Sequence, residues 1–336
     1  ALKTKNIHFL FVFAPLFYFY KVDLLLIKFY NFFLNIKNSI IQCETEIPAF
    51  LSTALKDKNN KIIFDKHGLV KEETLLKLGK SKKYSNRINM IDFIEKESIN
   101  NSDVIICVSN FFKEVIKTKY RFKKKIVILP MLIDGKVFFY SENLRMKVRK
   151  KLNLEDRIVL VYSGSVSKYQ KFESMLSFFK TAKKVDPNFF FLILTQKKFN
   201  DTVSKKMSNF EFNSKDYKVL NLEFSEVNDY LNASDIGLLF RDNILLNNVA
   251  SPTKLLEYLA AGVYPLITPK IGDSEKIIND LNFGLVIDNF SSEESIRDFI
   301  KKYKNNKKSR KEISYRTRKD YNWDTHLETL EEIYAK

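Results

Sequence analysis

The chain has 336 residues, 45% of them hydrophobic, which is enough for two domains of ordinary size with separate cores. Its two cysteines and three histidines form no cluster, so the sequence has neither a disulfide framework nor a zinc-binding pattern. The formal net charge is +17, and residues 1–150 contribute +14 of it, so the first half is expected to face an anionic partner, either phospholipid headgroups or nucleic acid.

The N-terminal segment is dense in leucine and aromatic residues. Its longest uncharged stretch, Asn6 to Tyr20, is shorter than the ~20 residues of a membrane-spanning helix. It has no basic leader with a small-residue cleavage site, so no signal peptide is expected. We predict a buried strand at His8–Phe13, followed by an aromatic helix or loop that can lie at a membrane interface. Because the chain starts at Ala1 without a methionine, an upstream edge is expected to be missing.

From about residue 40 onward, short apolar runs alternate with amphipathic stretches. The runs are rich in β-branched and aromatic residues, as expected for strands buried on both faces. Cys43 and Cys107 lie in such runs and are predicted to be buried free thiols. The predicted strands are Lys61–Phe64, Val104–Val108, Ile126–Leu129, Ile158–Ser163, Phe189–Leu194, Ile236–Phe240, Val263–Ile267 and Leu285–Ile287, and the predicted helices include Phe172–Val185 and Glu226–Ala233.

Alternation of this kind is typical of βαβ units in parallel sheets. A break near residues 131–151 separates two groups of elements. The sequence therefore predicts an α/β protein of two doubly wound domains that face each other. Ligands of such sheets bind beyond the carboxyl ends of the strands, so the site is expected in the cleft between the domains.

A glycine and several cations follow two of the predicted strands in the second half. Gly164, Lys168 and Lys171 come after the first strand of this half, and Arg241 comes after the third. Glycine, free amides and cations at converging strand ends can form a cradle for a diphosphate. Each of these side chains alone is equally compatible with a solvated surface.

The segment SPTKLLEYLAAG predicts a helix with Ser251 as its N-cap and Pro252 at its first position, ended by Gly262. Lys254 and Glu257 are three residues apart, so they share a face, and that face is not the leucine face. The pair is either a solvated surface ion pair or part of a binding site, because helix N-termini attract anions. In a binding site the carboxylate suits a ribose, whose two hydroxyls can both donate to it.

Three segments, YSGSVSKYQK, ASDIGLLFRDN and SPTKLLEYLAAG, resemble the nucleotide-sugar half of the retaining glycosyltransferases of family 4, which have the GT-B fold of two Rossmann-like domains. The resemblance continues through FDKHGLVKEE, ESINNSDVIICVS and LPMLIDGKVF, so it covers most of the chain from about residue 40 onward. It implies an acceptor-side domain at residues 1–140 without its first strand and glycine-rich loop, and a nucleotide-sugar-binding domain at residues 141–315. A C-terminal helix at residues 316–336 is implied to pack back toward the first domain.

The resemblance also implies roles for single residues of the second half. Glu257 would bind the donor ribose, and Lys171 would bind the donor phosphates. Ser165 stands where the family usually has an arginine, so Lys168 or Arg241 is expected to supply that charge. The implied donor-binding residues are Gly164, Ser165, Lys168, Arg241, Asn247, Ser251, Pro252, Thr253, Lys254 and Glu257.

In the first half, FDKHGLVKEE places His67 after a strand, with Asp65 as its expected neighbour. A lone histidine is more often structural than functional, but the resemblance makes this one a contact of the transferred sugar or of the acceptor hydroxyl. Glu72 and Glu73 are expected to cap the next helix. The implied acceptor-side residues are Asp65, His67 and Gly68, and the implied catalytic residues are His67, Lys171 and Glu257.

These expectations describe a transferase that moves a sugar from a nucleoside diphosphate donor to a cell-envelope glycan or lipid-linked acceptor, with retention of configuration. No metal or cofactor is expected, since no Asp-x-Asp motif is present. Basic stretches at residues 77–87 and 117–125 carry Lys and Arg worth about 1 kcal/mol each near anionic lipid, so the enzyme is expected in the bacterial cytoplasm, peripheral at the inner face of the cytoplasmic membrane.

Two alternatives remain. One is a catalytically silent GT-B scaffold that binds nucleotide, suggested by Ser165 and by Val249, which stands where many members have a second glutamate. The SPTK form of the helix start, followed by Glu257, resembles a variant branch of the family. The other is a basic nucleic-acid-binding protein, for which the sequence has no RNP, zinc-finger or helix-turn-helix signature.

Overall fold

The computed structural model describes residues 20–79, 81–306 and 308–334, and the strand predicted at His8–Phe13 lies outside them. The described chain divides into two compact units. The first unit runs to Cys107 and includes Val115–Val127, and the second comprises Val108–Glu114 and the chain from Ile128 onward. Within the described residues, no helix is both long enough and apolar enough to cross a bilayer.

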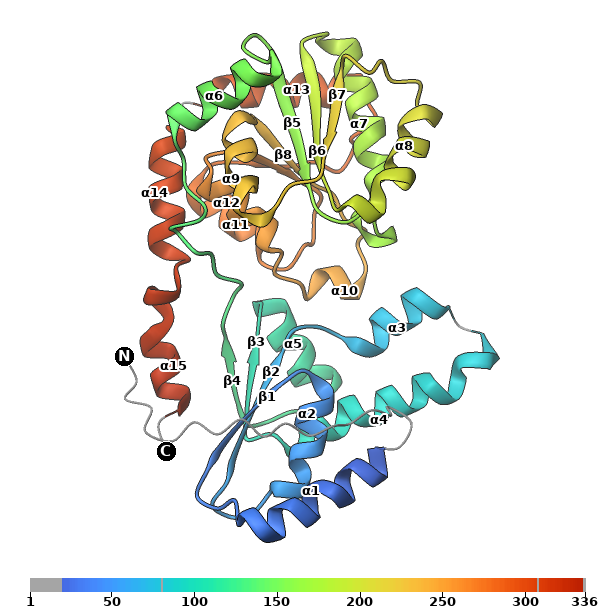
Figure 1. Cartoon of the computed structure of the whole chain (residues 1–336), viewed down its shortest axis with the longest axis vertical. Helices are drawn as coiled ribbons and strands as arrows, with labels where there is room; N and C mark the ends of the chain where they lie inside the picture. Colours follow the sequence, from blue (N-terminus) through green and yellow to red (C-terminus); the bar gives the residue numbers. More distant parts are fainter. Residues whose placement is uncertain (1–19, 80, 307, 335–336) are drawn as a thin grey trace. The chain divides into compact units, whose positions relative to one another are not determined.

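A sheet of strand order β1-β2-β3-β4 organises the first group of elements (Figure 1). The neighbouring strands β1, β2 and β3 pair in parallel, as the alternating pattern predicted. Both cysteines are free and buried, which confirms their prediction. The elements are α1 (Tyr20–Leu34), β1 (Ile40–Glu44), α2 (Glu46–Leu51), β2 (Lys61–Lys66), α3 (Val70–Leu78), α4 (Ser85–Asn101), β3 (Val104–Cys107), α5 (Asn110–Lys119) and β4 (Lys125–Ile128).

The second unit contains a parallel sheet of strand order β10-β9-β8-β5-β6-β7, with helices on both faces (Figure 1). The strands are β5 (Ile158–Ser163), β6 (Phe189–Leu194), β7 (Tyr217–Leu220), β8 (Ile236–Leu239), β9 (Tyr264–Ile267) and β10 (Leu285–Val286). The helices are α6 (Glu142–Leu152), α7 (Phe172–Val185), α8 (Asn200–Asn209), α9 (Phe224–Ala233), α10 (Leu245–Asn248), α11 (Thr253–Ala260), α12 (Ser274–Leu281), α13 (Glu293–Asn305), α14 (Arg310–Asp320) and α15 (Leu327–Tyr334).

The strand order of this sheet fixes where a ligand can bind. From β5 the chain proceeds outward to β6 and β7, and it then returns to the other side of β5 with β8, β9 and β10. This is the order of dinucleotide-binding folds, in which the crevice opens where the direction of winding reverses. Here the reversal lies between β5 and β8, so the ends of these two strands define the expected binding crevice.

Continuous apolar runs explain why the central strands of the second unit form. All six residues of β6 are buried, and β5 is buried at its four inner positions, as expected for a sheet covered by helices on both faces. The bounds of β5, β6 and α7 agree with the prediction. β7, with the sequence YKVL, had no predicted counterpart, because a run of four residues interrupted by Lys218 gives little pattern.

A buried carboxylate anchors two helices to the start of β8. Asp235 lies within ion-pairing distance of three guanidinium groups, at 2.6 Å from Arg145, 3.1 Å from Arg149 and 3.5 Å from Arg310. It also accepts a hydrogen bond from the Val159 N–H. Burial alone would raise the pKa of the Asp235 carboxyl, but the arginines hold that pKa below its usual value. The cluster therefore ties α6 and α14 to the sheet.

Candidate functional site

The candidate site of the second unit lies at the ends of β5 and β8, where the winding of the sheet reverses. Gly164 directly follows β5, and Arg241 follows β8 by two residues. The Arg241 N–H donates to Thr268 Oγ1 at 2.8 Å, which connects this end of β8 to the end of β9. Both residues thus lie at the strand ends where the winding reverses, which is where sheets of this order bind their ligands.

The side chain of Lys254 of α11 lies over Gly164 at these strand ends. A Cβ added to Gly164 would lie 2.3 Å from the Lys254 Cε and 2.5 Å from its Nζ, so a side chain here would displace the ammonium. Gly164 also has a φ of 142°, which favours glycine. The Lys254 Nζ lies 5.6 Å from the centre of the Tyr162 ring, a cation–π distance. Glycine is therefore required both by the backbone conformation and by the lysine above it.

Arg241 brings a second positive charge to the same place. Its guanidinium carbon lies 6.0 Å from the centre of the Tyr169 ring, and its Nε is buried with no hydrogen-bond partner among the described residues. Burial lowers the pKa of Arg241 below its usual value. A partly buried cation with an unused donor is a group that an anionic ligand can satisfy.

The charges of α11 are partly buried, which contradicts the alternative of a solvated surface pair. Burial, and to a smaller extent the charge of Arg241, lower the pKa of the Lys254 ammonium to about 8, although the charge of Glu257 opposes the shift. Burial raises the pKa of the Glu257 carboxyl, and Lys254 counteracts this rise. Lys254 and Arg241 thus repel each other beside a single partly compensating carboxylate.

Lys171 lies at the left-handed N-cap of α7, beside the same strand end. Its Nζ is 3.1 Å from Asp242 Oδ1 and 5.4 Å from the centre of the Phe290 ring. Because Asp242 directly follows Arg241, this ion pair brings Lys171 to the end of β8. The structure therefore gathers Gly164, Lys171, Arg241, Lys254 and Glu257 around the ends of β5 and β8.

The start of α11 differs from the prediction. The helix begins at Thr253 with Pro252 as its N-cap, and Pro252 has an extended ψ of 119°. Ser251 is not the N-cap, because its hydroxyl accepts a hydrogen bond from the Met131 N–H at 3.2 Å instead. A tertiary partner thus replaces the expected local bond, and the first amides of α11 are not capped by a side chain.

The remaining predicted donor residues fall into different surroundings. Ser165 lies next to Gly164; its carbonyl accepts a hydrogen bond from the Tyr162 hydroxyl, and its own hydroxyl lies 3.1 Å from that of Ser167. Asn247 is buried and donates to the Asp242 carbonyl at 2.9 Å, so it holds the loop after β8 in place. Lys168 begins a short 3-10 helix, and its side chain lies outside the described part of the structure.

One residue that positions the site was not predicted. Tyr258 of α11 is fully buried; its hydroxyl accepts from the Ser163 N–H at 3.1 Å and donates to the Leu238 carbonyl at 3.4 Å. A Cβ on Gly237 would lie 2.4 Å from the Tyr258 ring, so this strand glycine makes room for it. Tyr258 therefore fixes α11 against both strands that border the crevice. A glycine within a predicted strand was the available sequence signal.

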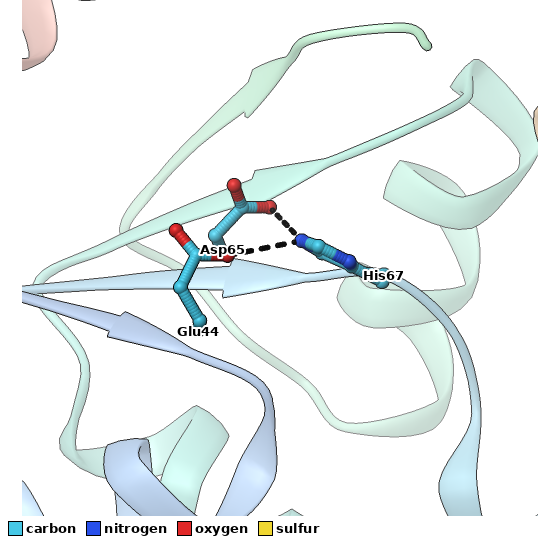
Figure 2. Close-up of side chains that lie close together, drawn as sticks. All are labelled: Glu44, Asp65 and His67. Atoms are coloured by element: carbon cyan, nitrogen blue, oxygen red, sulfur yellow. Dashed lines mark ion pairs between the residues drawn. The ribbon is translucent and has the colours of Figure 1, made fainter. Parts of the chain in front are cut away.

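A second group of polar side chains lies at the ends of β1 and β2 in the first unit. Figure 2 shows Glu44 and Asp65 converging on one ring nitrogen of His67. The His67 Nε2 lies 3.2 Å from Glu44 Oε2 and 3.3 Å from Asp65 Oδ1, which confirms Asp65 as its neighbour. Burial raises the pKa of the Asp65 carboxyl, the His67 charge lowers it, and Glu44 raises it further. Among the described residues, these three form the one group whose ligand atoms could hold a metal ion.

The residues that follow His67 in the predicted segment lie beside this group. Gly68 has no heavy atom within 4 Å of an added Cβ, so its surroundings are open. Glu72 and Glu73 lie in the first turn of α3, but they do not cap it as predicted, because the N-cap is Leu69 and no side chain of the described residues bonds the free amides there. Glu44 was missed as a site residue because its place beside Asp65 depends on the pairing of β1 with β2.

A family model described as glycosyl transferases group 1 matches residues 145–320, which is more than half of the chain. No curated protein matches the sequence. Similar solved structures include sucrose-phosphate synthase from Thermosynechococcus elongatus, with 13% identity, a TM-score of 0.71, and coverage of 97% of this chain and 79% of that chain. HepE from Anabaena in complex with UDP has 10% identity, a TM-score of 0.69, and coverage of 92% and 80%. WaaG, a glycosyltransferase involved in lipopolysaccharide biosynthesis, has 14% identity, a TM-score of 0.62, and coverage of 85% and 80%. At these identities the likeness shows the fold alone, which is GT-B, as predicted.

Proposed function

The chain belongs to the glycosyl transferases group 1 family, and from this premise we propose that it moves a sugar from a nucleoside diphosphate donor to a cell-envelope glycan or lipid-linked acceptor. Family membership makes it a glycosyltransferase and favours an enzyme over the nucleic-acid-binding alternative. The observation that carries the donor assignment is the pair of partly buried, mutually repelling cations Lys254 and Arg241 at the reversal of the second sheet. An anion bound between them removes that repulsion.

The diphosphate is the part of the donor that these cations fit. Lys254, Arg241 and the uncapped first amides of α11 supply positive charge and hydrogen-bond donors, and Lys171 adds a further ammonium when it exchanges Asp242 for phosphate. Fixed positive groups of this kind stabilise the charge that develops on the departing diphosphate in sugar transfer. In this proposal the donor diphosphate needs no metal.

Glu257 is the proposed contact of the donor ribose. It lies one helical turn from Lys254 on α11 and is partly buried, so it can accept hydrogen bonds from both ribose hydroxyls away from competing water. The structures of HepE with UDP and with UDP-glucose make uridine donors the first to test. We further propose that the transfer retains the configuration of the sugar and that His67 contacts the transferred sugar or the acceptor hydroxyl.

Calorimetric titration with UDP tests the donor site. We expect saturable binding that EDTA does not change and that Lys254→Met and Arg241→Met each weaken at least tenfold, since a hydrogen bond to a charged group is worth about 1.5–3 kcal/mol. Lys276→Met, which removes an exposed lysine of α12 in the same unit, is the matched control. Equal UDP affinity in all three variants would remove the site assignment. NMR of the anomeric proton of the product then tests retention.

We also propose that α1 holds the enzyme at an anionic membrane. One face of α1 packs on the core of the first unit through Ile27, whereas Phe29, Phe32 and Phe33 are 59%, 82% and 66% exposed. Exposed aromatic residues gathered on one helix suit insertion at a lipid interface. The charge of +14 on residues 1–150 adds attraction to anionic headgroups.

Cosedimentation with vesicles tests this surface. Wild type is expected to bind vesicles containing phosphatidylglycerol and to bind phosphatidylcholine vesicles much less. The double substitution Phe32→Ser and Phe33→Ser is expected to release it, while Tyr315→Ser, which removes a 61% exposed aromatic of the second unit, is not. Retention of the double variant on the vesicles would assign membrane binding to another surface.

A second candidate function is nucleotide binding without transfer. The specific observation is Val249, which is buried and apolar at a position where many members carry a glutamate. In that case UDP binds as above, but neither transfer nor slow hydrolysis of any nucleotide sugar is detected. Product assays with UDP-, GDP- and ADP-sugars separate the two candidates.

A further inference from the structure

The pairing of β1 with β2 places three metal-ligating side chains on one side of the first sheet. Glu44 is the direct register partner of Asp65 in the neighbouring parallel strand. Side chains alternate between the two faces of a strand, so partners in register share a face, and His67, two residues beyond Asp65, returns to that face. Lys66, between them, points the other way, where it is fully buried and bonds Glu46 and Glu95 at 2.7 and 2.6 Å.

The distances within this group match the edges of a coordination sphere. His67 Nε2 lies 3.2 Å from Glu44 Oε2 and 3.3 Å from Asp65 Oδ1, and all three ligand atoms lie within 4.8 Å of one another. Ligands about 2.1 Å from a tetrahedral or octahedral ion are about 3.0–3.4 Å apart, which is the spacing of the two nitrogen–oxygen pairs.

The negative charge of the group also favours a bound cation. Two carboxylates converge on a single ring nitrogen, which carries at most one proton and can satisfy only one of them fully. Apart from His67, the bond described for the Glu44 carboxylate comes from the neutral amide of Gln42, at 2.7 Å. A divalent ion satisfies both carboxylates and the imidazole at once. The group differs from a purely acidic cluster because its imidazole nitrogen favours first-row transition metals over Mg²⁺ and Ca²⁺.

We propose that Glu44, Asp65 and His67 bind one divalent first-row metal ion, of the Zn²⁺ or Mn²⁺ class, on the exposed edge of the first sheet. Imidazole together with carboxylates favours such ions over Mg²⁺ and Ca²⁺, which prefer oxygen ligands alone. His67 and Glu44 are more than half exposed, at 57% and 56%, so the solvent side of the ion stays open to further ligands. That these positions take an oxygen of the acceptor rests on the proposed function; the binding of the ion does not.

Calorimetric titration of the full chain with ZnCl₂ and with MnCl₂ tests the site, with MgCl₂ for comparison. We expect one saturable ion per chain, bound more weakly as Mg²⁺. The substitutions His67→Gln and Glu44→Gln should each weaken binding at least tenfold, since even an outer partner of a metal ligand is worth 10–100-fold. Glu73→Gln removes an exposed carboxylate of the same unit that pairs with Lys77, and it should leave binding unchanged.

Two outcomes would overturn the proposal. In the first, the wild type shows no saturable binding of Zn²⁺ or Mn²⁺. In the second, the wild type binds an ion but neither His67→Gln nor Glu44→Gln weakens the binding, so the ion occupies an adventitious surface site. Titration of the same samples with UDP keeps the two proposals apart, because all proposed donor residues belong to the second unit. UDP binding that persists in Glu44→Gln, together with a raised KM for the acceptor, supports the acceptor role of the ion.

Discussion

The charge of Lys254 is predicted to lower the stability of the folded protein when no ligand is bound. Replacing Lys254 by methionine tests this. Methionine keeps a long, flexible side chain over Gly164 but removes the charge. In the wild type, burial and the charge of Arg241 lower the pKa of Lys254 from 10.5 to about 8. A shift of about 2.5 pH units corresponds to roughly 3 kcal/mol of unfavourable free energy in the folded protein, which the unfolded chain does not experience.

The sign of this effect gives a distinctive pH dependence. Below pH 8 both folded and unfolded forms hold the proton, so the full penalty is present. Between pH 8 and 10.5 the folded form has lost the proton and the unfolded form still binds it, so the stability of the wild type rises with pH. At pH 7, Lys254→Met is therefore expected to be more stable than wild type by about 1–3 kcal/mol, the lower figure because Glu257 loses its compensating charge. This advantage should disappear by pH 10.5.

Urea unfolding at pH 7, 8.5 and 10 measures the difference. It is followed by the fluorescence of Trp323, the single tryptophan of the chain, which belongs to the second unit. Lys276→Met is the control for general lysine titration and should show no trend relative to wild type. A constant difference between Lys254→Met and wild type across this range would refute the reasoning. So would UDP binding by Lys254→Met at wild-type affinity, since the same charge is proposed to bind the diphosphate.

Three further predictions concern single positions. Gly164→Ala combines a φ of 142° with a Cβ that displaces the Lys254 ammonium, so UDP affinity should fall at least tenfold by calorimetry, with a stability loss of about 1–3 kcal/mol. Asp235→Asn leaves three arginines without their carboxylate and should lower the free energy of unfolding by about 3–5 kcal/mol in urea titrations. Because Val249 offers no hydrogen bond to a sugar, UDP and UDP-glucose should bind with dissociation constants within a factor of about ten, or 1.4 kcal/mol, of each other.

Strands buried on both faces were the most predictable part of the fold. Ile158–Ser163 and Phe189–Leu194 are continuous apolar runs, and no other element type competes for such short, aromatic and β-branched sequences. β8 ends one residue earlier than predicted, at Leu239, although Phe240 is also buried. Burial alone therefore does not locate the end of a strand; the loss of the ladder hydrogen bonds does. β7 was missed because it is short and only half-buried.

The candidate donor site was predictable where the chemistry follows a strand end. Gly164 and Arg241 were found in this way, and the strand order later showed that their two strands are neighbours. The N-cap at Ser251 was wrong because its hydroxyl bonds the Met131 N–H, a residue 120 positions away in sequence. Glu44 was missed for the same kind of reason. Local rules identify which residues can act, but partners far along the chain decide which of them do.

The departures from the family pattern fall at both ends of the proposed donor, with Ser165 at the nucleotide end and Val249 at the sugar end. At the nucleotide end, Glu257 and Lys254 keep the helix charges, and Arg241 is proposed to supply the charge that is missing at Ser165. At the sugar end, the position of the second glutamate is held by Val249, which is buried. The following residue, Ala250, packs closely on Gly272, where an added Cβ would lie 1.7 Å from the Ala250 carbonyl oxygen, so position 272 requires glycine. Because Val249 is buried and apolar, we expect selection among sugars to come from other residues, and we expect recognition of the nucleotide to follow the family pattern.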